Sequence, residues 1–183
     1  MSQFVMFVGP MFGGKTTRML SQLERYRYQS KNVFLFKPAI DERYSKAKVV
    51  THAGTGTEAF AVDHGQTIVS TIRRWTADPC VVAVDEAFMI PGSAQALLKL
   101  FSDGHTILVS SIQLSAAGEP FEEIKEMMPW ATKIEVCPAV CTKCPSDAYF
   151  TQKLSSNVEH GIEVGGSELY EPRCLKHFEN DLI

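Results

Sequence analysis

Short apolar runs alternate with longer amphipathic stretches through roughly the first 135 residues of this 183-residue chain. The apolar runs predict strands at residues 4–8, 33–37, 81–85 and 106–110. The amphipathic stretches predict helices at residues 14–29, 67–75, 93–101 and 121–128, and Pro129 ends the last of them. The third strand, Val81-Val82-Ala83-Val84, is apolar at every position, as a strand covered on both faces requires. This alternation is typical of an α/β fold with a parallel sheet.

The pattern departs from this alternation in two places. Residues 49–62 contain short runs separated by Ala53-Gly54-Thr55-Gly56, and we expect a β-hairpin there. After Ile134, helical periodicity is weak and four of the five cysteines follow. We therefore expect two domains, a main one at residues 1–135 and a smaller one at residues 136–183. A module of about 50 residues has only a small hydrophobic core, so it usually needs a bound metal or disulfides for stability.

Composition and charge exclude several classes of protein. Hydrophobic residues make up 45% of the chain and charged residues 21%, as in ordinary globular proteins. The formal net charge of −3 argues against a broad electrostatic surface for DNA or RNA. No apolar run reaches the roughly 18–20 residues that span a bilayer, and the first residues lack the basic start of a signal peptide. We expect a cytoplasmic protein with no membrane or nucleic-acid partner, whose reduced cysteines bind metal rather than form disulfides.

A glycine-rich phosphate-binding motif follows the first predicted strand. It fits the pattern G-x-x-x-x-G-K-[ST] and opens a predicted helix. Its residues are Gly9, Pro10, Met11, Phe12, Gly13, Gly14, Lys15 and Thr16, and Thr17 follows. In such a P-loop, backbone N–H groups converge on phosphate oxygens, the lysine reaches the β and γ phosphates, and the hydroxyl binds Mg²⁺. The motif predicts a nucleotide site, although a tight turn with a surface lysine would share the pattern.

The third predicted strand ends in two acidic residues. An apolar strand followed by Asp85 has the form of a Walker B element, whose carboxylate holds Mg²⁺. Glu86 comes next and would lie beside the reacting centre. A nucleotide hydrolase would use this glutamate to orient water, whereas a small-molecule kinase would use it to accept a hydroxyl proton. The two Walker elements do not separate these functions, and capping of the next helix is a third role open to the two carboxylates.

Paired short spacings predict a zinc site in the C-terminal region. Cys141 and Cys144 form C-x-x-C, and Cys174 and His177 form C-x-x-H after 29 intervening residues. Three thiolates and one imidazole complete a tetrahedral shell with no position for water, which is typical of structural zinc. Cys137 lacks this spacing and is not included. The metal would close a long loop, which we interpret as a lid over a substrate.

Several motifs together resemble the type II thymidine kinases, along nearly the whole chain. The P-loop with its Pro-Met-Phe insert and the Asp85-Glu86-Ala87 turn are similar to those of that family. So are residues 37–44 (KPAIDERY), 118–121 (GEPF) and 165–174 (GGSELYEPRC). The resemblance implies a RecA-like P-loop domain with a zinc-binding lasso. It also implies transfer of the γ-phosphate of ATP to the 5′-hydroxyl of thymidine or deoxyuridine, in pyrimidine salvage.

The resemblance further implies roles for individual residues. Glu86 would be the general base, and Arg43 with Lys15 would stabilise charge on the phosphoryl group. Asp41 would assist Thr16 and Asp85 at the magnesium site. Nucleoside contacts are implied for Met11, Phe88, Phe121, Thr151, Gly161, Ile162, Gly165 and Tyr170, with Thr151 beside the thymine methyl group. A homotetramer and feedback inhibition by thymidine triphosphate (dTTP) are implied in the same way.

Two positions depart from the family pattern and leave other hypotheses open. Phe88 stands where the family usually has glutamine, and Ala116 stands where its G-L-D-x-x-F segment has an aromatic residue. Loss of an aromatic wall could enlarge the nucleoside pocket or weaken thymidine binding. The rival hypotheses are a family member with altered nucleoside preference, a P-loop ATPase or switch, and a zinc-ribbon nucleic-acid module fused to a P-loop fold.

Overall fold

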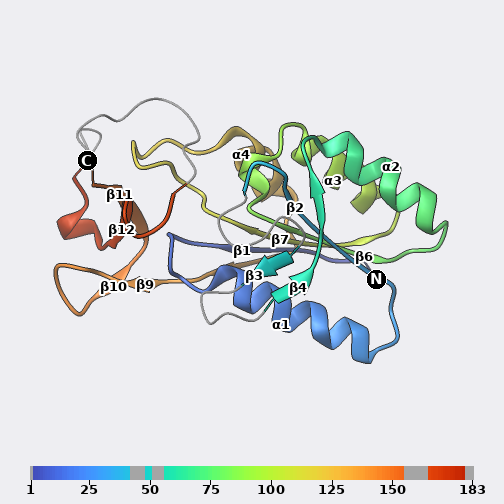
Figure 1. Ribbon diagram of the computed structural model, residues 1–183, viewed down its shortest axis with the longest axis horizontal. Coiled ribbons are helices and arrows are strands. Elements are labelled where there is room, and N and C mark those ends of the chain that lie inside the picture. The colour runs from blue at the N-terminus through green and yellow to red at the C-terminus, as the bar shows by residue number, and fades with distance from the viewer. Residues whose placement is uncertain (1, 42–47, 51–55, 155–164, 180–183) are drawn as a thin grey trace.

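The computed structural model describes residues 2–41, 48–50, 56–154 and 165–179 (Figure 1). Its centre is a six-stranded sheet in which every neighbouring pair of strands is parallel. The strand order is β5 (Phe60–Val62), β2 (Val33–Pro38), β6 (Val81–Asp85), β7 (Thr106–Ser111), β1 (Phe4–Val8) and β8 (Lys133–Val136). The carboxyl ends of parallel strands meet at one edge, so the loops that follow them gather there. The predicted α/β fold with a parallel sheet is confirmed.

Helices cover both faces of the sheet. Helix α1 (Lys15–Tyr28) lies on one face, and α2 (Gly65–Trp75), α3 (Ser93–Ser102) and α4 (Glu122–Met127) lie on the other (Figure 1). Successive side chains of β1 point to opposite faces of the sheet. Val5 and Phe7 belong to the apolar cluster under α1, whereas Phe4, Met6 and Val8 belong to the cluster on the other face. No helix in the described part of the chain is long and apolar enough to cross a bilayer.

The predicted strands and helices are present, with ends that differ by one or two residues. Strands β2 and β7 each continue one residue further than expected, to Pro38 and Ser111. Helix α1 begins at Lys15 because Gly14 has a φ of 74°, a left-handed conformation outside the helix. Helix α2 begins two residues early, where the His64 ring accepts a hydrogen bond from the Gln66 N–H at 3.1 Å. Helix α4 ends at Met127, and a 3₁₀ turn, η2 (Met128–Trp130), follows.

The hairpin expected at residues 49–62 is present only in part. Strands β3 (Lys48–Val50) and β4 (Gly56–Glu58) pair antiparallel, as a hairpin requires. The remaining strand, β5, instead pairs in parallel with β2 and extends the main sheet. The Phe60 ring lies 5.4 Å from the Phe36 ring, centroid to centroid, and this aromatic contact holds β5 against β2.

After β8 the described residues 137–154 and 165–179 form very short strands, and we call these residues the C-terminal segment. Strand β9 (Ala139–Val140) pairs with β10 (Asp147–Ala148), and β11 (Phe150–Lys153) pairs with β12 (Tyr170–Arg173), both antiparallel. A 3₁₀ turn, η3 (Leu175–His177), follows β12. The buried cluster of this segment consists of Ala139, Cys141, Ala148 and Cys174. The division into domains at residues 1–135 and 136–183 stays a prediction.

Candidate functional site

The P-loop connects the carboxyl end of β1 to the start of α1. Two of its residues besides Gly14 adopt positive φ angles, Gly9 at 151° and Phe12 at 65°. The buried Lys15 side chain folds back across the loop, and its Nζ donates a hydrogen bond of 2.7 Å to the Pro10 carbonyl. The loop and the N-terminus of α1 therefore surround a place suited to phosphate oxygens. Thr17 is exposed on the first turn of α1.

Thr16 and Asp85, which lie 69 positions apart in the sequence, meet at this edge of the sheet. The Thr16 hydroxyl donates a 2.8 Å hydrogen bond to Asp85 Oδ1. Ser110 lies opposite Asp85 in the β6–β7 register, is fully buried, and hydrogen-bonds to the same carboxylate. Burial, followed by the negative charge of Glu86, raises the pKa of Asp85 to about 7, although Thr16, Ser110 and Lys15 oppose the shift. A divalent cation beside Asp85 would stabilise the ionised carboxylate that burial disfavours.

Glu86 begins a sharp turn at the end of β6. It has φ 49° and ψ 47°, the left-handed region, and caps the 3₁₀ turn η1 (Ala87–Met89). A non-glycine residue in this region costs of order 1–2 kcal/mol, and such residues cluster at functional sites. Its Oε2 atom is buried. The Glu86 carboxylate is thus fixed next to Asp85, at the phosphate edge of the sheet.

Asp41 follows β2, the strand next to β6, and is also buried at the carboxyl edge of the sheet. Its backbone N–H donates to the Pro38 carbonyl at 3.2 Å, which closes a turn directly after the strand. Arg43, the cation expected beside the phosphoryl group, lies outside the described residues, as do Gly161 and Ile162.

The residues expected near a nucleoside come from three separate parts of the chain. Phe88 in η1 and Phe121 before α4 have ring centroids 4.4 Å apart. The buried Thr151 in β11 accepts a 3.1 Å hydrogen bond from the Met11 N–H of the P-loop. Gly165 is buried and Tyr170, the first residue of β12, is partly buried. The structure therefore brings the P-loop and β11 together and pairs the two aromatic rings.

Phe88 and Ala116, the two residues that differ from the family pattern, lie in different parts of the structure. Phe88 is 7% exposed and packs against Phe121, so its ring fills space on the aromatic side of the site. Ala116 is partly buried in the loop between Leu114 and Pro120, which form an isolated β-bridge. In the same loop the Gln113 Oε1 atom is buried and has no hydrogen-bond partner among the described residues.

Sequence reasoning missed two polar side chains at this edge, Ser110 and Glu123. Ser110 carries a signal that the strand register could have revealed, because it ends the strand next to the one that ends in Asp85. Glu123 in α4 accepts hydrogen bonds of 2.7 Å from the backbone N–H groups of Gly92 and Ala94, at the start of α3. Since those partners lie about 30 residues away, no local pattern identifies Glu123.

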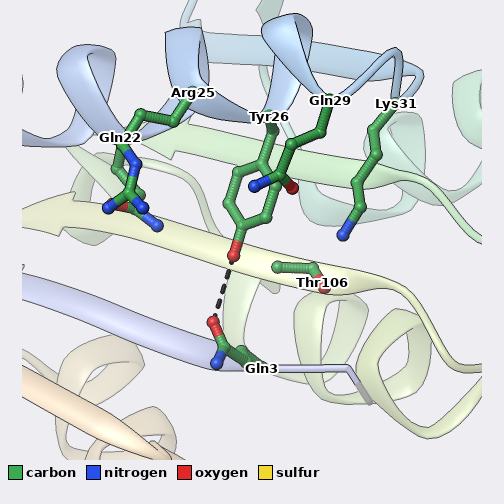
Figure 2. A pocket seen from close by; sticks show the side chains of 7 residues that line it. All are labelled: Gln3, Gln22, Arg25, Tyr26, Gln29, Lys31 and Thr106. Carbon is green, nitrogen blue, oxygen red and sulfur yellow. Dashed lines mark hydrogen bonds between the residues drawn. The ribbon is translucent and has the colours of Figure 1, made fainter.

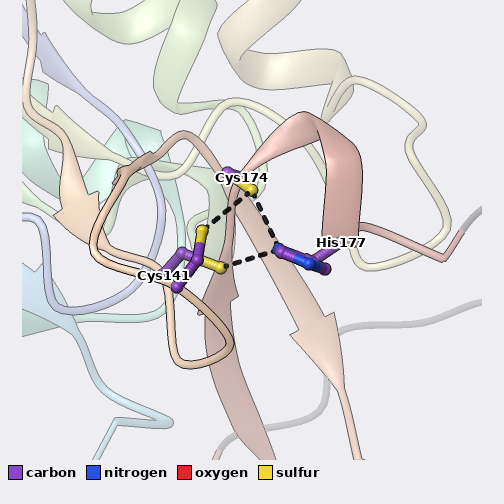
Figure 3. A group of neighbouring side chains, drawn as sticks. Cys141, Cys174 and His177 are labelled. Atoms are coloured by element: carbon purple, nitrogen blue, oxygen red, sulfur yellow. Dashed lines mark hydrogen bonds between the residues drawn. The ribbon is translucent and has the colours of Figure 1, made fainter.

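Three cysteines and one histidine converge in the C-terminal segment (Figure 3). The ligand atoms of Cys141, Cys144, Cys174 and His177 all lie within 4.8 Å of one another. The Cys144 and Cys174 sulfurs are 3.8 Å apart, and His177 Nδ1 lies 3.7 Å from the Cys141 sulfur. A tetrahedral zinc ion with Zn–S bonds of about 2.3 Å has sulfurs about 3.8 Å apart, so the four residues fit zinc.

The thiols near this cluster differ in their readiness to ionise. Burial opposes ionisation of Cys141, but hydrogen bonds from the backbone at Cys174 and Lys143 and from His177 lower its pKa to about 6. Cys137 is not part of the cluster, and its pKa is raised by burial. Its thiol donates instead to the Glu135 carbonyl at 3.6 Å.

A polar cavity of about 360 Å³ lies at the opposite, amino edge of the sheet (Figure 2). It is lined by Gln3, Gln22, Arg25, Tyr26, Gln29, Lys31 and Thr106. Inside it the Tyr26 hydroxyl donates to Gln3 Oε1 at 3.0 Å. The cavity is next to the C-terminal end of α1 and lies away from the P-loop, which is at the carboxyl edge of the sheet.

Comparison with known proteins agrees with this geometry. A sequence model described as "Thymidine kinase" matches residues 2–178. A thymidine kinase from Pyrobaculum aerophilum is 36% identical over 179 residues, which cover 95% of this chain and 97% of that protein. A thymidine kinase from Thermococcus kodakarensis is 38% identical over 177 residues, covering 92% and 90% of the two chains.

Proposed function

Because this chain belongs to the thymidine kinase family, we propose that it transfers the γ-phosphate of ATP to the 5′-hydroxyl of thymidine and of deoxyuridine. The product is the 5′-monophosphate, as in pyrimidine salvage. The observation that carries the proposal is the fixed position of Glu86, directly after an Asp85 that hydrogen-bonds to Thr16 of the P-loop. A carboxylate at this place can reach a hydroxyl that approaches the γ-phosphate.

Glu86 acts as the general base in the transfer step. It accepts the proton of the 5′-hydroxyl while that oxygen forms its bond to the γ-phosphorus. The bond between the γ-phosphorus and the β–γ bridging oxygen breaks, and ADP leaves with the electron pair. Lys15 and Arg43 stabilise the charge on the transferring group, and the N–H groups of the P-loop hold the phosphates in position.

Thr16, Asp85 and Asp41 offer the hydroxyl and carboxylate oxygens that Mg²⁺ prefers. The ion neutralises charge on the phosphates when it is bound. The cluster of Cys141, Cys144, Cys174 and His177 has no position for water and serves a structural zinc ion.

The nucleoside lies between the aromatic pair and the C-terminal segment. Phe88 and Phe121 pack against it, while Met11 and Thr151 contact the base near the thymine methyl group. Gly161, Ile162, Gly165 and Tyr170 belong to a lasso that closes over the base and excludes water. In this proposal residues 1–135 are the catalytic domain and residues 136–183 are the lid domain.

The remaining expectations follow family membership rather than the geometry of the chain. We propose a cytoplasmic homotetramer that dTTP inhibits by feedback. Phe88 and Ala116 are the positions at which this chain would differ in its preference among thymidine, deoxyuridine and their analogues.

The decisive experiment compares the wild-type protein with Glu86→Gln in a thymidine phosphorylation assay. We expect activity in the wild type and a loss of roughly 10²–10⁴-fold in the variant, the usual contribution of a general base. Equal rates would remove Glu86 as the base. Binding of ATP to both proteins is the control, because the substitution leaves the P-loop intact.

ADP formation with and without thymidine separates a kinase from a P-loop ATPase or switch. A kinase forms ADP in proportion to the nucleoside that it phosphorylates. If ADP forms at the same rate without any nucleoside, the protein is an ATPase.

A further inference from the structure

One residue of the P-loop packs into the core of the zinc-binding region. The buried cluster of the C-terminal segment contains the zinc ligands Cys141 and Cys174, and the apolar side chains packed against it are Phe12 and the third thiol ligand, Cys144. Phe12 precedes Lys15 by three positions in the sequence and shares a core with the metal ligands. A single short loop therefore connects the phosphate-binding lysine to the zinc-binding core. 

Two backbone contacts join the same loop to the C-terminal segment. The Met11 N–H donates to the Thr151 hydroxyl at 3.1 Å. On the inner side of the loop the Cys137 carbonyl oxygen lies so close that a Cβ atom at Gly9 or Gly13 would be 2.2 Å from it. Only glycine fits at such separations, so this close approach of backbone to backbone depends on both parts staying in place.

The backbone of Phe12 itself needs this support. Its φ of 65° is a left-handed conformation that is strained for a non-glycine residue. Packing of its side chain against the cluster offsets that strain. The cluster has only four buried residues, two of them metal ligands, so it is too small to persist without the metal.

We propose that zinc occupancy and nucleotide binding are linked through Phe12, which is a positioning residue for the P-loop. The proposal rests on the proposed nucleotide site. With zinc bound, the core holds Phe12 and the loop keeps its phosphate-binding shape. Without zinc, the loop occupies that shape for only part of the time, and nucleotide affinity falls by the same fraction. Because linkage is reciprocal, bound nucleotide must in turn raise the affinity for zinc by the same factor, and we expect the tighter binding to appear as slower loss of the ion.

The experiment measures zinc release from the loaded protein to the dye 4-(2-pyridylazo)resorcinol. It compares protein alone with protein saturated by a non-hydrolysable ATP analogue and Mg²⁺, and no nucleoside is present, so closure of a lid on thymidine plays no part. We expect the nucleotide to slow zinc release by about fivefold or more, the lower end of ordinary coupling. In Phe12→Ala we expect faster release and almost no effect of the nucleotide, with partial rescue in Phe12→Leu.

Phe150→Ala is the matched control. The Phe150 ring stacks on Phe178 at 4.8 Å within the C-terminal segment, so its loss weakens the segment but leaves the Phe12 side chain and the Thr151 hydroxyl in the protein. This variant should release zinc faster yet keep the full protection by nucleotide. Equal zinc release with and without bound nucleotide in the wild type overturns the linkage, and full protection in Phe12→Ala overturns the role of Phe12. If the wild type binds no nucleotide at all, the proposed phosphate site fails and the linkage fails with it.

Discussion

Every residue of β1, β6 and β7 in the central sheet is buried, and apolar clusters lie on both faces of these strands. Among the described residues, the strands of the C-terminal segment have two to four residues, and two of the four buried residues in its cluster are cysteines. The sheet thus holds Asp85 and Glu86 by hydrophobic burial, whereas we expect the C-terminal segment to depend on a metal. The groups for phosphate chemistry lie on the part with its own core. The groups expected to close over the nucleoside lie on the part that contains the four candidate metal ligands.

Removing one metal ligand should have the largest effect, because it should unfold the C-terminal segment and leave the central sheet intact. We expect Cys174→Ala to lose its zinc, because structural zinc sites contribute of order 10 kcal/mol to folding. Backbone amides in the C-terminal segment should then exchange rapidly with deuterium, while those of β1, β6 and β7 stay protected. Thymidine phosphorylation should fall by roughly 100-fold or more, since small errors in substrate position already cost that much.

Cys137→Ala is the control for this variant, because Cys137 is a buried thiol near the cluster but outside it. It should keep one zinc ion per chain by elemental analysis. If β1, β6 and β7 lose their protection together with the C-terminal segment in Cys174→Ala, the two regions are one cooperative unit and the comparison is wrong.

A smaller effect is expected inside the sheet region, at Glu123. Its two carboxylate oxygens accept from the N–H groups of Gly92 and Ala94, which gives α3 the cap that its own residues do not supply. The Ser93 hydroxyl, within 3.2 Å of the same carboxylate, also lies 2.9 Å from the Ala87 carbonyl. Glu123 therefore supports the turn that carries Glu86 and Phe88.

Glu123→Gln retains one acceptor oxygen and should lose about 1–2 kcal/mol of stability. The melting temperature should fall by roughly 2–4 °C for each kcal/mol in a domain of this size. The KM for thymidine should rise, while the KM for ATP and the rate of zinc release stay unchanged. Glu122→Gln is the matched control, because Glu122 is exposed and, within the described part of the chain, pairs only with Lys125 at the surface. Equal effects of the two substitutions would show that the cap is unimportant.

The sheet and the P-loop were predictable because their signals are local. A run such as Val81–Val84 and the motif from Gly9 to Thr16 are each contained in a few consecutive residues. The spacing of Cys141, Cys144, Cys174 and His177 was equally informative, because metal geometry constrains which residues meet.

The parts that could not be predicted depend on which elements become neighbours. Ser110 supports Asp85 only because β7 lies beside β6, and β5 leaves the expected hairpin because Phe60 packs against Phe36. Phe12 was expected only as a P-loop residue, since nothing in the motif shows that its side chain enters the zinc cluster. Arg43, Gly161 and Ile162 lie outside the described residues, so their roles stay predictions.

The smallest effect is expected at His105, at the amino edge of the sheet and far from both the metal and the phosphates. The buried His105 ring accepts a 3.2 Å hydrogen bond at Nδ1 from the Cys80 N–H, so Nδ1 must be unprotonated in the folded protein. Burial lowers the pKa of His105 below its usual value of about 6.5, although the charge of Asp103 opposes the shift.

The sign of the pH effect follows from which state binds more protons. Below about pH 6.5 the unfolded chain takes up a proton at His105 that the folded protein resists, so stability falls as the pH drops toward the lowered folded pKa. His105→Asn supplies an acceptor oxygen to the Cys80 N–H but does not titrate. Between pH 7.5 and 5.5 the melting temperature of the wild type should therefore fall about 1–2 °C more than that of the variant. Both proteins contain the same metal ligands, so protonation of the zinc site cancels in this difference. Parallel declines in the two proteins would mean that the buried His105 ring is already free to take up a proton in the folded state.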